Sequence, residues 1–252
     1  TDTDTDVAFN IAGTATDVFE RVPMAAGYCV AVADPTPVIA GGDLVILSAG
    51  VTDETGSFLL TDITTTSALG LMAVVTDCEG AESTIFASAT GIPSGAYSEV
   101  EDGETIEGLS AMVLNNTMLA AIDGNLTGAG YAGSLSADGG FLGFLMDAVG
   151  TPIAGGTVSA AGATPYYPVG DTDSMGTGAW FIDPTSGEPA VATGSNGMFV
   201  IPAAPITTYS GTADGYTFDS FTSGSLPGMA LFVAMWADEG GETDTGSADT
   251  GM

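Results

Sequence analysis

Four short blocks of this sequence occur twice, in the same order, once in each half of the chain. A repeat with such a long period predicts two similar structural units, and it restricts the fold more than any other feature of the sequence. The paired blocks are residues 37–44 and 152–158, residues 52–60 and 193–201, residues 79–80 and 214–215, and residues 109–114 and 229–233.

The second block indicates what kind of structure the repeat encodes. It has the pattern T-x-x-x-G-x-F, in which a polar turn containing glycine precedes an alternating strand. The alternation places Phe58 in the first half, and Phe199 in the second, on one face of that strand. Short strands separated by glycine-rich turns recur along the chain, which contains 37 glycines. This pattern is typical of a β-sandwich or a β-barrel.

The order of the motifs resembles a known family. Residues 150–216 contain G-x-P-I-A-G-G-x-V, then T-x-x-x-G-x-F-x-[IV], then A-x-G-Y, and in this they resemble the carboxypeptidase regulatory-like, or transthyretin-like, domain. The resemblance covers residues 141–237 well and residues 7–116 more loosely, because residues 33–37 (A-D-P-T-P) replace the usual D-x-x-G-x-P. It implies a seven-stranded Greek-key sandwich that serves as an accessory or stalk module in bacterial secreted and surface proteins, with no catalytic residues of its own.

The predicted fold class is therefore all-β, with two tandem Greek-key β-sandwiches of transthyretin or immunoglobulin type and a short linker helix. The helix is expected at residues 117–126, where apolar residues fall at 118, 119 and 122. The predicted organisation is an acidic Thr/Asp leader at 1–6, a first sandwich at 7–116, a linker at 117–140, a second sandwich at 141–238 and an acidic low-complexity tail at 239–252.

The charge of the chain excludes several classes of function. It has 32 acidic residues, one basic residue (Arg21) and neither histidine nor lysine, which gives a formal net charge of −31. Catalytic relays and zinc sites that use histidine are therefore excluded, as are Schiff-base and phosphate-binding lysines. One arginine cannot neutralise a phosphate backbone, so we expect no nucleic-acid partner. Hydrophobic residues make up 45% of the chain, which predicts a folded protein rather than a disordered polyanion.

The two cysteines, Cys29 and Cys78, lie beside strand-like runs of the first unit. Two free thiols would be typical of a cytosolic protein. The Thr/Ser-rich segments, the missing lysine and the first residue being threonine instead favour a secreted or cell-surface protein whose signal peptide has been removed. We therefore predict a Cys29–Cys78 disulfide. The longest apolar run, at residues 229–237, is about half a membrane span, so we expect no insertion into a membrane.

An insertion distinguishes the second unit from the first. Residues 163–189 lengthen the interval between the first two blocks, and they contain Tyr166, Tyr167, Trp180 and Phe181. Long loops on a rigid scaffold often bind ligands, so these aromatic residues are candidates for an interaction loop that captures carbohydrate. The alternative is a cap that packs its own aromatic side chains.

The same insertion contains a candidate calcium site. Asp171, Asp173 and Asp183 could supply oxygen ligands for Ca²⁺, which binds six to eight oxygen atoms. The segment lacks the complete EF-hand pattern and its closing glutamate. Because clusters of aspartate arise by chance in such an acidic chain, a solvated acidic loop is the alternative.

Two further motifs are weaker. Residues 244–247 and 249–251 each contain D-T-G, the aspartic-protease signature, but they lie together in a glycine- and acid-rich tail. That chemistry requires two carboxylates that share a proton in a deep cleft, so we predict a solvated tail and no catalytic residue. Asn115 and Asn125 fit the N-x-[ST] pattern and are candidate glycosylation sites.

Two hypotheses of function follow. The first is a non-enzymatic extracellular structural protein, a subunit of a surface filament, stalk or coat whose main partner is another copy of itself. In its strand-exchange form Val7, Phe9 and Ile11 belong to a donor strand that completes a neighbouring sandwich; the alternative is that this strand pairs within its own sandwich. The second hypothesis is a monomeric secreted binding module that uses residues 163–189 to bind Ca²⁺ or carbohydrate.

Overall fold

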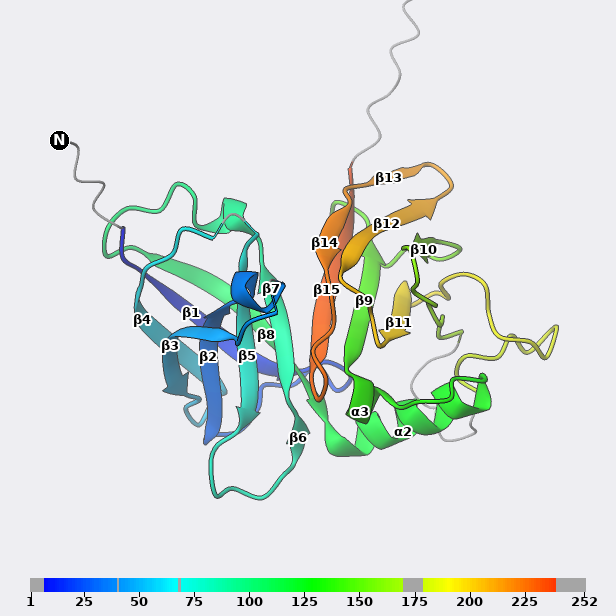
Figure 1. The fold of residues 1–252 in the computed structure, drawn as a ribbon, viewed down its shortest axis with the longest axis horizontal. Helices are drawn as coiled ribbons and strands as arrows, with labels where there is room; N and C mark the ends of the chain where they lie inside the picture. Colours follow the sequence, from blue (N-terminus) through cyan, green and yellow to red (C-terminus); the bar gives the residue numbers. More distant parts are fainter. Residues whose placement is uncertain (1–6, 40, 68, 170–178, 239–252) are drawn as a thin grey trace, which may run out of the picture.

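The computed structural model describes residues 7–39, 41–67, 69–169 and 179–238. Strands predominate, and they form two sandwiches that lie side by side (Figure 1), so the predicted all-β class is confirmed. The strands are β1 (Phe9–Asp17), β2 (Tyr28–Asp34), β3 (Val45–Val51), β4 (Ser57–Ile63), β5 (Leu71–Asp77), β6 (Ile85–Phe86), β7 (Ser88–Ile92), β8 (Thr105–Asn115), β9 (Gly140–Met146), β10 (Thr157–Ser159), β11 (Met198–Pro202), β12 (Thr207–Ala213), β13 (Tyr216–Phe218), β14 (Phe221–Ser223) and β15 (Ala230–Asp238). The helices are α1 (Thr36–Ile39), α2 (Asn116–Gly128), α3 (Leu135–Asp138) and the 3₁₀ helix η1 (Ser94–Ala96).

The first sandwich is built from β1 to β8. One sheet has the order β4-β1-β8-β6, and the opposing strands have the order β3-β2-β5-β7. Successive side chains of a strand point to opposite faces, and the inward-facing ones meet between the two layers. Ile11 of β1, Val75 of β5 and Val113 of β8 are completely buried in this core.

The second sandwich is built from β9 to β15. β9 lies between β11 and β15 in one layer, and β12 pairs with β10, β13 and β14 in the other. Aromatic side chains fill the space between the layers. The rings of Phe141 and Tyr209 meet edge to face with their centroids 4.9 Å apart, and Tyr209 stacks on Phe221 at 5.3 Å.

Tyr209 makes this core sensitive to alkaline pH. Burial raises the pKa of Tyr209 to about 12, and its hydroxyl donates a hydrogen bond of 2.6 Å to the Pro205 carbonyl oxygen. Because the folded state favours the neutral phenol, this contribution to stability is intact below the unfolded pKa of 10 and is lost as the pH rises toward 12. We expect the melting temperature of the wild type to fall more steeply between these pH values than that of Tyr209→Phe. Equal slopes would contradict the assignment.

The two sandwiches share a pattern of strand pairing, which confirms the repeat. β1 pairs antiparallel with β4 and parallel with β8; β9 pairs antiparallel with β11 and parallel with β15. Phe58 lies in β4 and Phe199 in β11, so the T-x-x-x-G-x-F block forms the equivalent strand in both halves. Of the late apolar blocks, residues 109–114 likewise lie in β8 and residues 230–233 in β15.

One block of the repeat does not correspond in the structure. β10 follows Pro152 and pairs with β12, just as β2 pairs with β5 in the first sandwich. By its pairing β10 is therefore the counterpart of β2, whereas residues 37–39 belong to α1 and residues 41–44 lead into β3. The sequence similarity between residues 37–44 and residues 152–158 therefore relates two segments that occupy different places in the fold.

A continuous sheet joins the two sandwiches. β7 of the first pairs in parallel with β15 of the second, so that Ala230, Leu231 and Phe232 lie opposite residues 88–90. One hydrophobic core spans the junction, where Met72 and other residues of the first sandwich pack with residues of the second. The two predicted domains are therefore fused through their sheets rather than connected only by a linker (Figure 1).

The helix predicted at residues 117–126 is α2, and it is longer than predicted. It begins after Asn115, whose side-chain oxygen accepts a hydrogen bond of 2.8 Å from the Met118 N–H and so caps the helix. Ile122 and Leu126 are completely buried in a core shared with β9 and β11. The segment 117–140 is thus not a free linker, because α2 and α3 pack against one end of the second sandwich (Figure 1).

Candidate functional site

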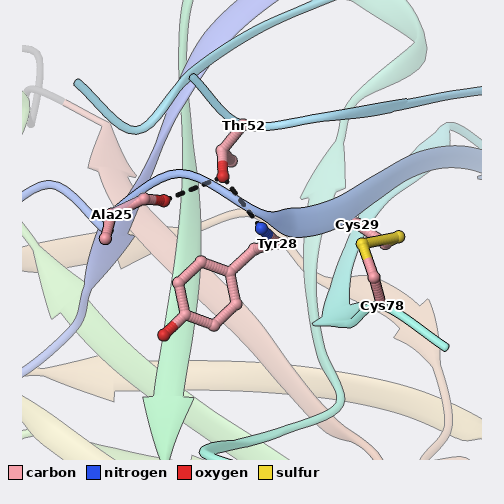
Figure 2. The surroundings of a disulfide bond; sticks show 5 residues. All are labelled: Ala25, Tyr28, Cys29, Thr52 and Cys78. Carbon is pink, nitrogen blue, oxygen red and sulfur yellow. Dashed lines mark hydrogen bonds between the residues drawn. A yellow bond between two sulfur atoms is a disulfide. The ribbon is translucent and has the colours of Figure 1, made fainter. Parts of the chain in front are cut away.

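The disulfide predicted between Cys29 and Cys78 is present. It joins β2 to the residue that follows β5, with the two Cα atoms 5.0 Å apart (Figure 2). Thr52 lies beside it and is buried: its hydroxyl donates to the Ala25 carbonyl oxygen at 2.9 Å and accepts from the Tyr28 N–H at 3.1 Å. The bridge and these hydrogen bonds fasten the start of β2 to its neighbours.

The aromatic residues of the insertion do not form an exposed interaction loop. Trp180 and Phe181 are 1% exposed and Tyr167 is 4% exposed, while Tyr166 pairs through its backbone with Val200 of β11. The Tyr167 hydroxyl accepts a hydrogen bond of 2.8 Å from the Val158 N–H. The prediction of an aromatic binding loop is therefore corrected, and the alternative of a self-packed cap holds.

The insertion is attached to helix α2. The backbone N–H of Trp180 donates a buried hydrogen bond of 2.8 Å to the Asn125 side-chain oxygen, and the Asn125 amide nitrogen donates to the Ala121 carbonyl oxygen. The ring of Trp180 lies 5.0 Å from that of Phe181 and 6.0 Å from that of Phe19. Side chains from distant parts of the chain thus enclose Trp180.

Of the three candidate calcium ligands, the structure describes only Asp183. Its carboxylate accepts hydrogen bonds from the Thr185 N–H and the Ser186 hydroxyl. The Thr185 backbone hydrogen bond is the main cause that lowers the pKa of Asp183. Asp171 and Asp173 lie outside the described residues, and within the described ranges no three acidic or cysteine residues are grouped to hold a metal ion. The calcium site stays a prediction.

The two glycosylation candidates are engaged inside the fold. Asn125 is 2% exposed, so a glycan cannot be accommodated on it. Asn115 is half-buried, caps α2 and donates from its amide nitrogen to the Asp17 carboxylate at 2.8 Å. The prediction for Asn125 is corrected because its side chain is buried, whereas Asn115 stays a prediction, since a glycosylated amide nitrogen keeps one N–H that can still donate to Asp17. The two D-T-G motifs lie outside the described residues.

The segment predicted as a donor strand is paired within its own sandwich. β1 lies between β4 and β8, with Phe9 3% exposed and Ile11 completely buried. Val7 precedes the strand and is 45% exposed. The donor-strand prediction is corrected for this reason: both edges of β1 are already hydrogen-bonded, so it has none to offer a neighbour.

Two surfaces emerge that the sequence did not indicate. The first, which we call the β3 edge, is the outer side of β3, together with the adjoining part of β4. Val45, Ile46, Val51 and Leu59 are 43–58% exposed there. Within the described residues β3 pairs with β2 alone and is one of the terminal strands of the branched eleven-stranded sheet, and the Ser48 hydroxyl of β3 donates to the Thr61 carbonyl oxygen of β4 at 2.9 Å. The run V-I-L-S-A-G-V predicts a strand, but its apolar composition gives no sign that one side is open.

The second surface is a groove of about 510 Å³ between the two sandwiches. Val38 and Leu69 line it from the first sandwich, and Phe221 and Leu226 line it from the second. β7 and β15 contribute where their pairing ends. No sequence motif could reveal this groove, because its lining comes from five segments that lie far apart in the chain.

Within the described part of the chain, no helix has the length and apolar character needed to span a membrane. No family model and no curated protein sequence matches the chain.

Three similar solved structures are distant from this chain. The TIE protein of Bacillus anthracis is 15% identical with a TM-score of 0.24, over 92% of this chain and 34% of that one. The shaft pilin SpaA from Lactobacillus rhamnosus GG, as its D295N mutant, is 10% identical with a TM-score of 0.27, over 92% and 99%. A streptococcal ancillary pilin is 14% identical with a TM-score of 0.24, over 94% and 64%. The chain thus spans about a third of the TIE protein, and likenesses this low say nothing about function.

Proposed function

We propose that this protein is a non-enzymatic structural subunit outside the cell, a stiff unit of a surface filament, stalk or coat. The observation that carries the proposal is the pairing of β7 with β15, which joins the two sandwiches through one sheet and one core. Domains on a flexible linker move relative to each other, whereas a continuous sheet resists bending. The disulfide supports a location outside the cytoplasm, since such bonds persist in oxidising compartments.

The resemblance of both halves to transthyretin-like domains belongs to the same proposal. A duplicated domain requires the same strand neighbours in each copy, and the β1–β4–β8 and β9–β11–β15 sets meet this requirement. Modules of that kind serve as stalks, which suits a rigid body better than it suits a catalyst.

Copies of the protein associate, in this proposal, through β3, one of the terminal strands of the eleven-stranded sheet. Within the described chain β3 pairs with β2 alone, whereas at β10 the Tyr167 hydroxyl already bonds the N–H and the carbonyl oxygen of Val158. β3 contains no charged residue and lacks the lysine or proline that commonly protects an edge strand. A contact between β3 of one copy and a different surface of the next is head-to-tail, so it repeats without closing and produces a filament. In this proposal, that contact links the copies instead of an exchange of β1 between neighbouring molecules.

Substitution of Ile46 tests this assembly. Ile46 is 50% exposed on β3, and a lysine there places a charge where the next strand must dock. The net charge of −31 opposes association, so we expect wild-type polymers to increase with salt as the repulsion is screened. Electron microscopy should show regular polymers of the wild type at high salt and only single particles of Ile46→Lys.

The matched control is Val191→Lys, which makes the same change in charge at a residue that is 83% exposed and lies outside the β3 edge. It should polymerise like the wild type. Polymers of normal length from Ile46→Lys, or a wild type that stays monomeric at every salt concentration, would contradict the proposed assembly.

A further inference from the structure

The groove between the sandwiches lies where the sheet splits. β15 pairs with β7 only as far as Phe232, and its pairing with β13 begins at Ala237. On that side residues 233–236 of β15 have no partner strand among the described residues, and all four line the groove. The space is therefore a wedge between two diverging strands, at the rim of the core that joins the sandwiches.

The groove has the size and lining of a small-molecule site. Pockets that bind such ligands enclose roughly 300–1,000 Å³ and are mostly apolar with a few polar groups, and they often lie between domains. This groove encloses about 510 Å³. Apolar side chains such as Met72, Phe221 and Leu231 line most of it, and Ser220, Thr222 and their neighbours supply hydroxyl groups on one side.

The charge of the residues that line the groove determines which charge on a ligand is favoured. Among the described residues that line the groove, Asp219 is the only ionisable one, and it is exposed. An anion would meet this carboxylate and the field of a protein with a net charge of −31. The acidic tail at residues 239–252 is disfavoured as an occupant for the same reason.

We propose that the groove binds a small cationic amphiphile, with an apolar chain in the wedge and an amine beside Asp219. This is a binding activity beyond the structural role, and it does not depend on polymer formation. A series of three ligands with one chain length separates the two parts of the proposal: decylamine, decanol and decanoate, each used below the concentration at which it aggregates.

The expected order of affinity follows from the groove. Decanol should bind through burial of its chain, and decylamine should bind about two- to fivefold more tightly, the range of an exposed ion pair. Decanoate should bind more weakly than decanol. Equilibrium dialysis at physiological salt measures the affinities. Trp236 lines the groove and is 54% exposed, so its fluorescence should shift, while Trp180 is buried against α2.

Two substitutions test whether the ligand binds in the groove and whether its amine lies beside Asp219. A Cβ atom built on Gly91, at the groove, meets nothing within 4 Å, so the side chain of Gly91→Phe begins in open space beside the wedge and should weaken decanol and decylamine by about tenfold or more. Gly124 of α2 is equally open and lies away from the groove, so Gly124→Phe is the matched control. Asp219→Asn should remove the preference for decylamine over decanol and leave decanol binding unchanged, whereas Asp214→Asn, outside the groove, should keep the preference.

Several results would overturn the proposal. Equal affinity of the three ligands, or decylamine binding that survives Gly91→Phe, means that the amine binds the acidic surface rather than the groove. If Gly91→Phe instead changes the molecular mass measured by light scattering and leaves ligand binding intact, a second copy of the chain occupies the groove. The Ile46→Lys variant tests polymer formation separately. If the groove does not bind the amine, the proposed structural function is therefore unaffected.

Discussion

Replacing both Cys29 and Cys78 with serine lowers the free energy of unfolding by about 4 kcal/mol on the chain-entropy model. The two residues are 49 positions apart, so the bridge removes a large loop-closure entropy from the unfolded chain. Denaturation in guanidinium chloride, followed by far-ultraviolet circular dichroism, measures the change.

The reducing agent supplies the control for this experiment. Reduction should destabilise the wild type by a similar amount and leave the double variant unchanged, because the variant has no bond to reduce. A wild type whose midpoint is the same with and without reductant would contradict the role given to the disulfide.

Trp180→Ala lowers the free energy of unfolding by about 3–5 kcal/mol, the usual effect of removing a large buried aromatic side chain. Trp180 is 1% exposed and lies in the core shared by α2, β9 and β11. The cavity left behind would loosen the whole insertion from α2, since the ring contacts of Trp180 with Phe19 and Phe181 are lost with it.

Trp236→Ala is the matched control, because Trp236 is 54% exposed. Its effect should stay below about 1 kcal/mol. If the two substitutions cost the same, Trp180 is not the anchor of a packed cap, and the insertion would again be a candidate interaction loop.

Local patterns of the sequence predicted the strands well, and the disulfide was predicted from the composition that favours a secreted protein. Alternation around Phe58 and Phe199 depends on the period of a strand, which is fixed by backbone geometry. The helix predicted at residues 117–126 is part of α2, because its apolar spacing is a local feature, whereas the cap at Asn115 was not predicted.

What the sequence could not predict is which distant segments meet. The alternating pattern of β1 is the same whether it pairs with β4 and β8 or with a neighbouring molecule, so the donor strand could not be excluded. The aromatic residues of the insertion were visible, but their contact with Asn125 and Phe19 depends on the tertiary fold. The pairing of β7 with β15 joins residues more than a hundred positions apart, and no motif marks either strand for the other.

The fusion of the two sandwiches is the central claim, and the two tryptophans test it most directly. Trp180 and Trp236 are the only tryptophans in the sequence and both belong to the second half, whereas the disulfide lies in the first. Thermal unfolding of the Cys29→Ser/Cys78→Ser variant should be followed by tryptophan fluorescence and by circular dichroism together. If the sandwiches unfold as one cooperative unit, removing the disulfide lowers both midpoints equally. A fluorescence midpoint that stays at its wild-type value, while circular dichroism shows an earlier transition, would mean that the sandwiches unfold independently and would contradict the account.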